Sequence, residues 1–96
     1  MKRRVQLEAV ARDTLRYLPP DTKKRIRAAL LALADDPLGL TSSIDVKRLA
    51  RPTKDGPDIL RARLGDWRIV YAPRERELLV LNVFHRSEGY GWLERL

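Results

Sequence analysis

Three arginines surround a two-residue turn near the middle of the chain. The segment from 59 to 72 reads ILRARLGDWRIVYA, and Gly65-Asp66 between two alternating runs predicts a tight β-hairpin. In that hairpin Arg63 lies opposite Arg68, and Arg61 shares their face because side chains alternate along a strand. Guanidinium groups bind phosphate and carboxylate bidentately, so the pattern predicts an anion site. A solvated basic face, or pairing with acidic side chains elsewhere in the chain, accounts for it about equally well.

The other face of the same hairpin is apolar and is predicted to belong to the core. The turn places Leu64 opposite Trp67 and Ala62 opposite Ile69. Like charges directly opposite each other destabilise an antiparallel pair by up to about 1 kcal/mol, so the facing arginines favour a functional reason for their position. The predicted core side chains of the hairpin are Leu60, Ala62, Leu64, Trp67, Ile69 and Tyr71.

The composition indicates one small folded domain spanning residues 1–96. The hydrophobic fraction is 44%, with no low-complexity segment or internal repeat. The absence of cysteine excludes disulfides and thiolate chemistry, and a single histidine argues against a zinc site, so no metal or other cofactor is expected. No apolar run approaches the roughly 18 residues of a membrane span, and the amino terminus is not a secretory signal. We expect a soluble, cytoplasmic protein.

The chain is strongly basic. It has 20 Lys and Arg against 13 Asp and Glu, a formal net charge of +7 and a pI near 10.4. This balance suits a nucleic acid, an acidic protein or an anionic membrane surface as partner. No strongly basic amphipathic helix carries bulky aromatic residues on its apolar side, which argues against the membrane surface.

Two helices are predicted before the hairpin. After a short strand from 3 to 7, apolar residues recur with helical spacing from 8 to 18 and again from 20 to 35. Pro19-Pro20 separates these helices, and Asp36-Pro37 ends the second. Their combined apolar stripe needs a sheet to cover it. The expected fold is α+β, in the order β-α-α-β-β-β, with a helix hairpin packed on one face of a mainly antiparallel sheet.

The long connection from Leu38 to Pro57 is predicted to be a loop, because it is rich in Gly, Ser, Thr and Pro. It carries Lys47, Arg48 and Lys54 and leads directly into the arginine-bearing strand, which favours a functional role. Disorder from 51 to 57 is an alternative.

A last strand is predicted from Leu78 to Phe84. Every second residue from 79 to 83 is apolar, and we place these residues on the core face. The residues between them then face the other way, so Asn82 and Arg86 point toward the arginines. His85 then lies at the strand edge, aimed initially toward the helices. The set that we place on the core face is Leu79, Leu81 and Val83.

The element order, the segment RARLGDWRIVY and the later segment FHRSEGY together resemble the RelE/ParE superfamily of toxins from bacterial and archaeal toxin-antitoxin pairs. The resemblance covers almost the entire chain. It implies a metal-independent endoribonuclease, an mRNA interferase, that cuts messenger RNA in the ribosomal A site. It also implies a smaller, acidic antitoxin, which we expect to cover the arginines or to displace the carboxy-terminal segment around Trp92.

The resemblance also implies site residues. Basic residues on the second strand, an arginine on the third, an arginine ending the fourth and a nearby tyrosine form the active site of the RelE-like branch. The matching positions here are Arg61, Arg63, Arg68, Arg86 and Tyr90.

The implied reaction is attack of a ribose 2′-hydroxyl on the adjacent phosphodiester. Arg68 and Arg86 suit stabilisation of the charge that develops on the phosphorane, and Tyr90 suits stacking on a base or orienting the hydroxyl. RelE-like sites often carry lysine on the second strand, and an arginine with a pKa above about 12 is a poor base. His85 is therefore the candidate acid or base, with a hydrogen-bonded histidine at a strand end as the alternative. Further contacts to RNA or the ribosome are expected from Lys47, Arg48, Lys54 and Asn82.

Two other functions fit the same fold. A ParE-like inhibitor of DNA gyrase is a binder with no nuclease role, and that branch typically lacks the complete set of arginines and tyrosine. A degenerate toxin, or a non-catalytic basic RNA-binding member, is also consistent with the missing lysines on the second strand.

Overall fold

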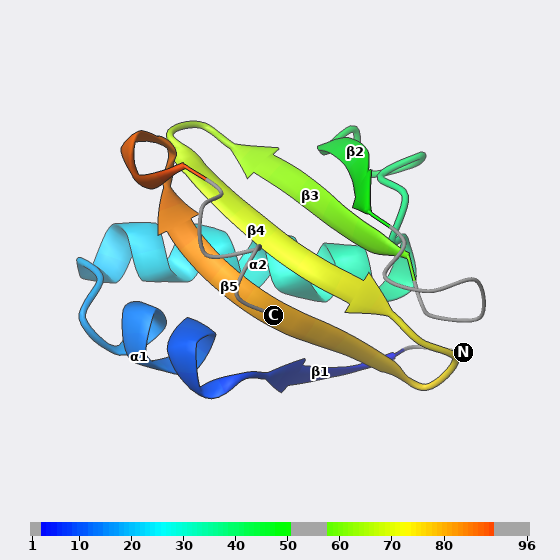
Figure 1. The fold of residues 1–96 in the computed structure, drawn as a ribbon, viewed down its shortest axis with the longest axis horizontal. Coiled ribbons are helices and arrows are strands. Elements are labelled where there is room, and N and C mark those ends of the chain that lie inside the picture. The colour runs from blue at the N-terminus through cyan, green and yellow to red at the C-terminus, as the bar shows by residue number, and fades with distance from the viewer. Residues whose placement is uncertain (1–2, 51–57, 90–96) are drawn as a thin grey trace.

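The computed structural model describes residues 3–50 and 58–89, which form a five-stranded sheet with two helices packed against it (Figure 1). The strand order is β1-β5-β4-β3-β2, in which β1 pairs with β5 in parallel and the other neighbours are antiparallel. This is the expected α+β arrangement, with one strand more than predicted. The elements are β1 (Arg4–Leu7), α1 (Ala9–Arg16), α2 (Pro20–Asp35), β2 (Asp45–Ala50), β3 (Ile59–Leu64), β4 (Trp67–Pro73), β5 (Glu77–His85) and the short 3₁₀ helix η1 (Arg86–Glu88).

The two helices form where the sequence predicts them. Pro20 opens α2 at a position where its missing N–H costs no hydrogen bond, and Asp21 lies in the first turn. Neither described helix is long and apolar enough to cross a membrane. The buried helix residues, which pack against the sheet, are Ala11, Leu15, Ile26, Ala29, Leu30, Leu33 and Ala34.

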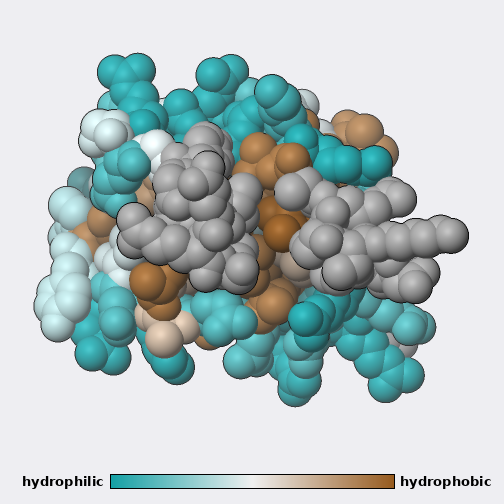
Figure 2. All heavy atoms as spheres, viewed as in Figure 1, coloured by the Kyte–Doolittle hydropathy of each residue, from teal (hydrophilic) through white to brown (hydrophobic). Residues whose placement is uncertain are grey.

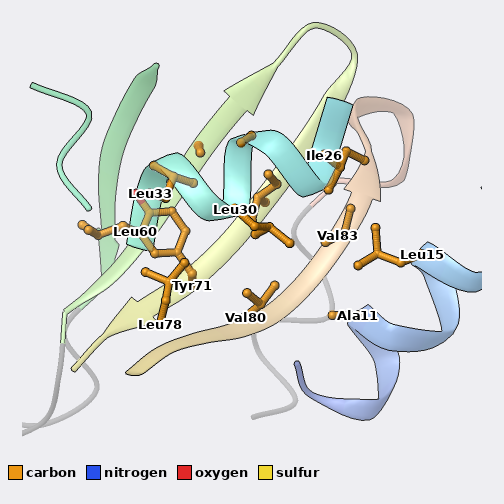
Figure 3. Packing of buried hydrophobic residues seen from close by; sticks show 13 residues of the cluster. Ala11, Leu15, Ile26, Leu30, Leu33, Leu60, Tyr71, Leu78, Val80 and Val83 are labelled. Atoms are coloured by element: carbon orange, nitrogen blue, oxygen red, sulfur yellow. The ribbon is translucent and has the colours of Figure 1, made fainter. Parts of the chain in front are cut away.

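The main core lies between these helices and one face of the sheet (Figure 3). Tyr71 of β4 is fully buried there, and its hydroxyl donates a hydrogen bond to the Pro37 carbonyl just beyond α2. Burial and the neighbouring Asp36 carboxylate raise the pKa of Tyr71, so this hydroxyl stays protonated. Trp67 packs against the same core and is partly buried. Both aromatic residues lie on the face predicted for them.

The loop after α2 is organised by Asp36. Its carboxylate accepts hydrogen bonds at 2.9 Å from the backbone N–H groups of Leu40, Thr41 and Ser42. The Ser42 N–H is the main cause of a pKa well below the ordinary value for Asp36; partial desolvation opposes it, and the other two N–H groups reinforce it. The loop therefore has a defined path into the strand that follows.

The prediction of a loop from Leu38 to Pro57 is wrong for residues 45–50, which form β2 at one edge of the sheet. β2 pairs antiparallel with β3, with a bulge between Arg48 and Ala50. The charged residues in DVKRLA hide the alternation, and the strand is stabilised by pairing with β3 rather than by composition.

The predicted face of β5 is right at one end and wrong at the other. Val83 lies opposite Ile69 in the core, as expected, but Val80 lies opposite Tyr71. The pairing shifts by one residue at this point, so Leu81 is the extra residue of a β-bulge. The residues before the bulge therefore change face: Leu78 and Val80 are fully buried in the main core, where Leu79 and Leu81 were expected.

The sheet face away from the helices carries a second, smaller apolar cluster. Ile59, Val70 and Phe84 are buried in it, and Leu49 and Leu81 pack against it. Figure 2 shows hydrophobic residues in the middle of the molecule and mostly hydrophilic residues around the margin, in the view that has α2 behind the sheet. The predicted arginine site therefore borders this second apolar cluster.

Candidate anion-binding site on the β3–β4 hairpin

The β3–β4 hairpin has the predicted register. Arg63 lies opposite Arg68 and Leu64 opposite Trp67. Gly65 has φ +61°, which glycine adopts without strain, so the turn closes over two residues. Arg61, Arg63 and Arg68 thus share the face away from the helices, which we call the arginine face.

An aspartate on β2 neutralises part of the arginine face. Asp45 lies opposite Arg63 in the β2–β3 register. Its Oδ2 atom is 2.8 Å from Arg63 Nη2 and 3.4 Å from Arg61 Nη1. Partial desolvation raises the pKa of Asp45, but the charges of the two arginines lower it more, so the net pKa lies below its ordinary value. This is the acidic pairing that the sequence left open.

Asp45 is the residue of this site that the sequence reasoning missed. The run from Ile44 to Lys47 alternates, with Ile44 and Val46 on the core side and Asp45 and Lys47 on the other side. A period of two over these residues was the signal that could have found it. The nearby glycine and the Thr-Ser-Ser sequence masked that signal.

The predicted RNA-contact residues are placed in different ways. Lys47 lies opposite Arg61 and so adds a lysine to the arginine face, although on β2 rather than in a loop. Arg48 lies opposite Leu60 and pairs with Asp58, Nη2 to Oδ2, at 3.1 Å. Asn82 lies opposite Val70 on the arginine side of the sheet, where its Oδ1 accepts the Val83 N–H. Lys54 lies outside the described residues.

Arg68 differs from its two neighbours in its partners. Its Nη1 donates to the carbonyl oxygens of Gly65 at 2.7 Å and Trp67 at 3.0 Å. Within residues 3–50 and 58–89 its guanidinium group has no carboxylate partner. These hydrogen bonds to carbonyl oxygens hold the guanidinium group at the turn and do not neutralise its positive charge.

Arg86 is tied to the turn of the same hairpin. It begins η1, directly after β5, and its N–H donates to the Asp66 carbonyl at 2.8 Å. Its Nε is 3.3 Å from Asp66 Oδ1, with both side chains well exposed. Such exposed pairs are readily exchanged for other ligands. Arg86 and Arg68 therefore both bond to the two-residue turn.

His85 does not join the arginine face. Its ring packs edge-on against Trp67 at 5.5 Å between centroids, at the end of β5 and on the side of the sheet that carries the helices. Its Nδ1 accepts the Ser87 N–H and lies 2.9 Å from Ser87 Oγ, so the proton of the neutral ring lies on Nε2. This is the hydrogen-bonded strand-end histidine of the alternative interpretation. Tyr90 lies outside the described residues.

The arrangement can bind and stabilise a phosphate group but contains few proton carriers. Arg61, Arg63 and Arg68 supply fixed cationic donors, and Lys47 adds an ammonium group. No group of three or more His, Cys, Asp or Glu residues suited to a metal ion occurs in the described part of the chain.

The comparisons with known proteins agree with this fold. A family model for the ParE toxin of the type II toxin-antitoxin system parDE matches residues 5–90. No curated protein sequence matches the chain. The archaeal RelE–RelB complex from Pyrococcus horikoshii OT3 contains a similar chain with 27% identity and a TM-score of 0.75, covering 93% of this chain and 100% of that one.

Two further solved structures have the same fold. The toxin-antitoxin complex RelBE2 from Mycobacterium tuberculosis matches with 25% identity, a TM-score of 0.69, and coverage of 90% of this chain and 100% of that one. The intact RelBE complex of E. coli matches with 15% identity and a TM-score of 0.63, covering 86% and 95%, and supports the fold alone. The fold and the family match define a small toxin domain. The chain belongs to the RelE/ParE superfamily, the toxins of type II toxin-antitoxin systems.

Proposed function

We propose that this toxin is a ribosome-dependent endoribonuclease that cleaves messenger RNA in the cytoplasm by attack of a 2′-hydroxyl on the adjacent phosphodiester. The observation that carries the proposal is the convergence of Arg61, Arg63 and Arg68 on one face of the hairpin. A convergent set of planar, permanently charged donors fits a phosphodiester better than it fits any neutral ligand.

The roles follow from the partners of each side chain. Arg68 has no competing carboxylate among the described residues, so it is the residue best suited to stabilise the charge of the phosphorane. Arg86 is tied to the same turn by Asp66 and takes the same role. Arg61, Arg63 and Lys47 bind the RNA backbone.

Proton transfer is the step for which the arginine face offers least. In the proposal His85, at the end of β5 beside the hairpin turn, is the proton carrier, and Tyr90 orients the hydroxyl or stacks on a base. Arg48, Lys54 and Asn82 add contacts to the messenger or to ribosomal RNA. The cognate partner is an acidic antitoxin that covers the arginine face or displaces the segment around Trp92; the structural relatives are toxin-antitoxin complexes.

The test is cleavage of messenger RNA on programmed ribosomes by the purified chain and by Arg68→Ala. Loss of one donor to developing charge is expected to lower the cleavage rate about 10²- to 10³-fold. Arg74→Ala is the matched control, because Arg74 is an exposed arginine in the β4–β5 connection, at the other end of β4. Thermal unfolding of both variants checks that they fold. Full activity of Arg68→Ala would exclude the proposed role, and absence of cleavage by the unmodified chain would exclude the function.

Inhibition of DNA gyrase is the second candidate, because the family model that matches is that of ParE. A supercoiling assay with purified gyrase separates the two functions. Inhibition of supercoiling together with no messenger cleavage would assign the chain to the gyrase-inhibiting branch.

A further inference from the structure

The two arginines of β3 are already occupied by an anion from the same chain. A single oxygen of Asp45 lies 2.8 Å from Arg63 Nη2 and 3.4 Å from Arg61 Nη1. The Arg61 side chain is only 11% exposed, whereas those of Asp45 and Arg63 are about half exposed at 48% and 55%. Little of the Arg61 side chain is therefore open to another anion, and the Asp45 carboxylate itself is within reach of solvent.

Carboxylate and phosphate are alternative ligands of the same guanidinium donors. A phosphate that approaches Arg61 and Arg63 must compete with the Asp45 oxygen for the atoms that this oxygen now holds. The competition is possible because β2 is an edge strand and Asp45 is its first residue, so this side chain can turn outward without disturbing the central strands.

Asp45 also reduces repulsion on the arginine face. Without it, Arg61, Arg63 and Lys47 would lie together on two neighbouring strands with no counter-charge among the described residues. The carboxylate thus holds both guanidinium groups in place when no ligand is bound, and it lowers their attraction for any polyanion.

We infer that Asp45 is an internal competitor for the phosphate site, which keeps Arg61 and Arg63 preset and yields them to an RNA phosphate. This deepens the proposed function, on which it rests, by assigning the residue that limits binding of RNA to the free toxin. A merely structural Asp45 predicts the opposite sign, because its loss would misplace the arginines and weaken binding.

The experiment compares Asp45→Asn with Glu77→Gln in the full-length protein. Each substitution removes one negative charge. Glu77 pairs with Arg4 at the opposite edge of the sheet, at 3.4 Å, which equals the distance between Asp45 and Arg61. The probe is a short fluorescein-labelled single-stranded RNA without ribosomes, followed by anisotropy across a salt series. Asp45→Asn is expected to bind about tenfold more tightly than Glu77→Gln. The slope of log affinity against log salt concentration should be steeper for Asp45→Asn by about 0.7 to 1.4, because the freed arginines neutralise one or two further RNA phosphates.

Equal or weaker binding of Asp45→Asn relative to Glu77→Gln would overturn the inference. A second measurement uses the unmodified chain and needs no variant to fold: sulfate, as a stand-in for phosphate, is added while the Asp45 carboxyl is titrated by carbon NMR. Release of the arginines to sulfate should raise the pKa of Asp45, and an unchanged titration would contradict the competition. Neither measurement depends on catalysis. Absence of messenger cleavage would therefore refute the proposed function, while the competition between Asp45 and phosphate could still be measured.

Discussion

Gly39 and Gly89 offer a matched test of how tightly the loop before β2 is built. Their φ angles are nearly the same, +69° and +70°, in a range that other residues rarely adopt. Their surroundings differ. A Cβ atom added at Gly39 would clash with the Ile44 carbonyl oxygen and approach Val46 Cγ2 to 2.9 Å. One added at Gly89 meets no atom of the described residues within 4 Å.

The expected magnitudes follow from these two contributions. The positive φ costs an alanine about 1–2 kcal/mol at Gly39. At Gly89 the cost is about 1–3 kcal/mol, because its ψ of −167° completes a backbone conformation that is essentially restricted to glycine. At Gly39 the clash is with backbone, so the loop must move, and overpacking of this kind costs about 1–3 kcal/mol more. Gly39→Ala should therefore lower the free energy of unfolding by about 2–5 kcal/mol and Gly89→Ala by about 1–3 kcal/mol.

The assay is urea unfolding followed by far-UV circular dichroism, with thermal unfolding as a second readout. For a domain of this size each 1 kcal/mol corresponds to about 4–8 °C in Tm. Because the Gly39 loop leads into β2, amide exchange in β2 should also accelerate in Gly39→Ala and not in Gly89→Ala. Equal destabilisation by the two substitutions would refute the reasoning, since it would mean that only the backbone angle matters.

Three further outcomes test the core and the loop. Asp36→Asn should be less stable than the unmodified chain near neutral pH. The gap should close as the pH falls below about 4, because a carboxylate with a depressed folded pKa loses its contribution on protonation; a gap independent of pH would contradict this. Tyr71→Phe should cost about 0.5–1.5 kcal/mol in urea unfolding through loss of its bond to the Pro37 carbonyl, and no loss would disprove that bond. Leu78→Ala should cost about 2–5 kcal/mol and Leu79→Ala clearly less, whereas the reverse order would contradict the bulge in β5.

Much of the fold follows from local sequence. The helices are set by apolar spacing and by the prolines around them, and the β3–β4 register is set by Gly65-Asp66, because a two-residue turn fixes which residues face each other. These interactions join residues close in sequence, so their pattern can be read along the chain. Arg61, Arg63 and Arg68 are on one face for this reason alone.

Other features depend on partners distant in sequence. β2 is a strand because the backbone of β3 pairs with it, although the connection in which it lies has the composition of a loop. The bulge at Leu81 allows β5 to bury both Val80, before the bulge, and Val83, after it, in the same core. An apolar stretch such as LLVL carries no local signal for which residues turn inward.

The candidate site divides in the same way. The chain by itself determined that three guanidinium groups share one face of a hairpin, since alternation and a tight turn require nothing from the rest of the molecule. Only the tertiary structure decided what balances those charges: pairing of β2 with β3 brings Asp45 between Arg61 and Arg63, from 16 residues away in the case of Arg61. Charge neutralisation depends on the distance between the charged groups in space. Strand pairing sets that distance, and the sequence around Asp45 or around the arginines does not indicate which residues will pair.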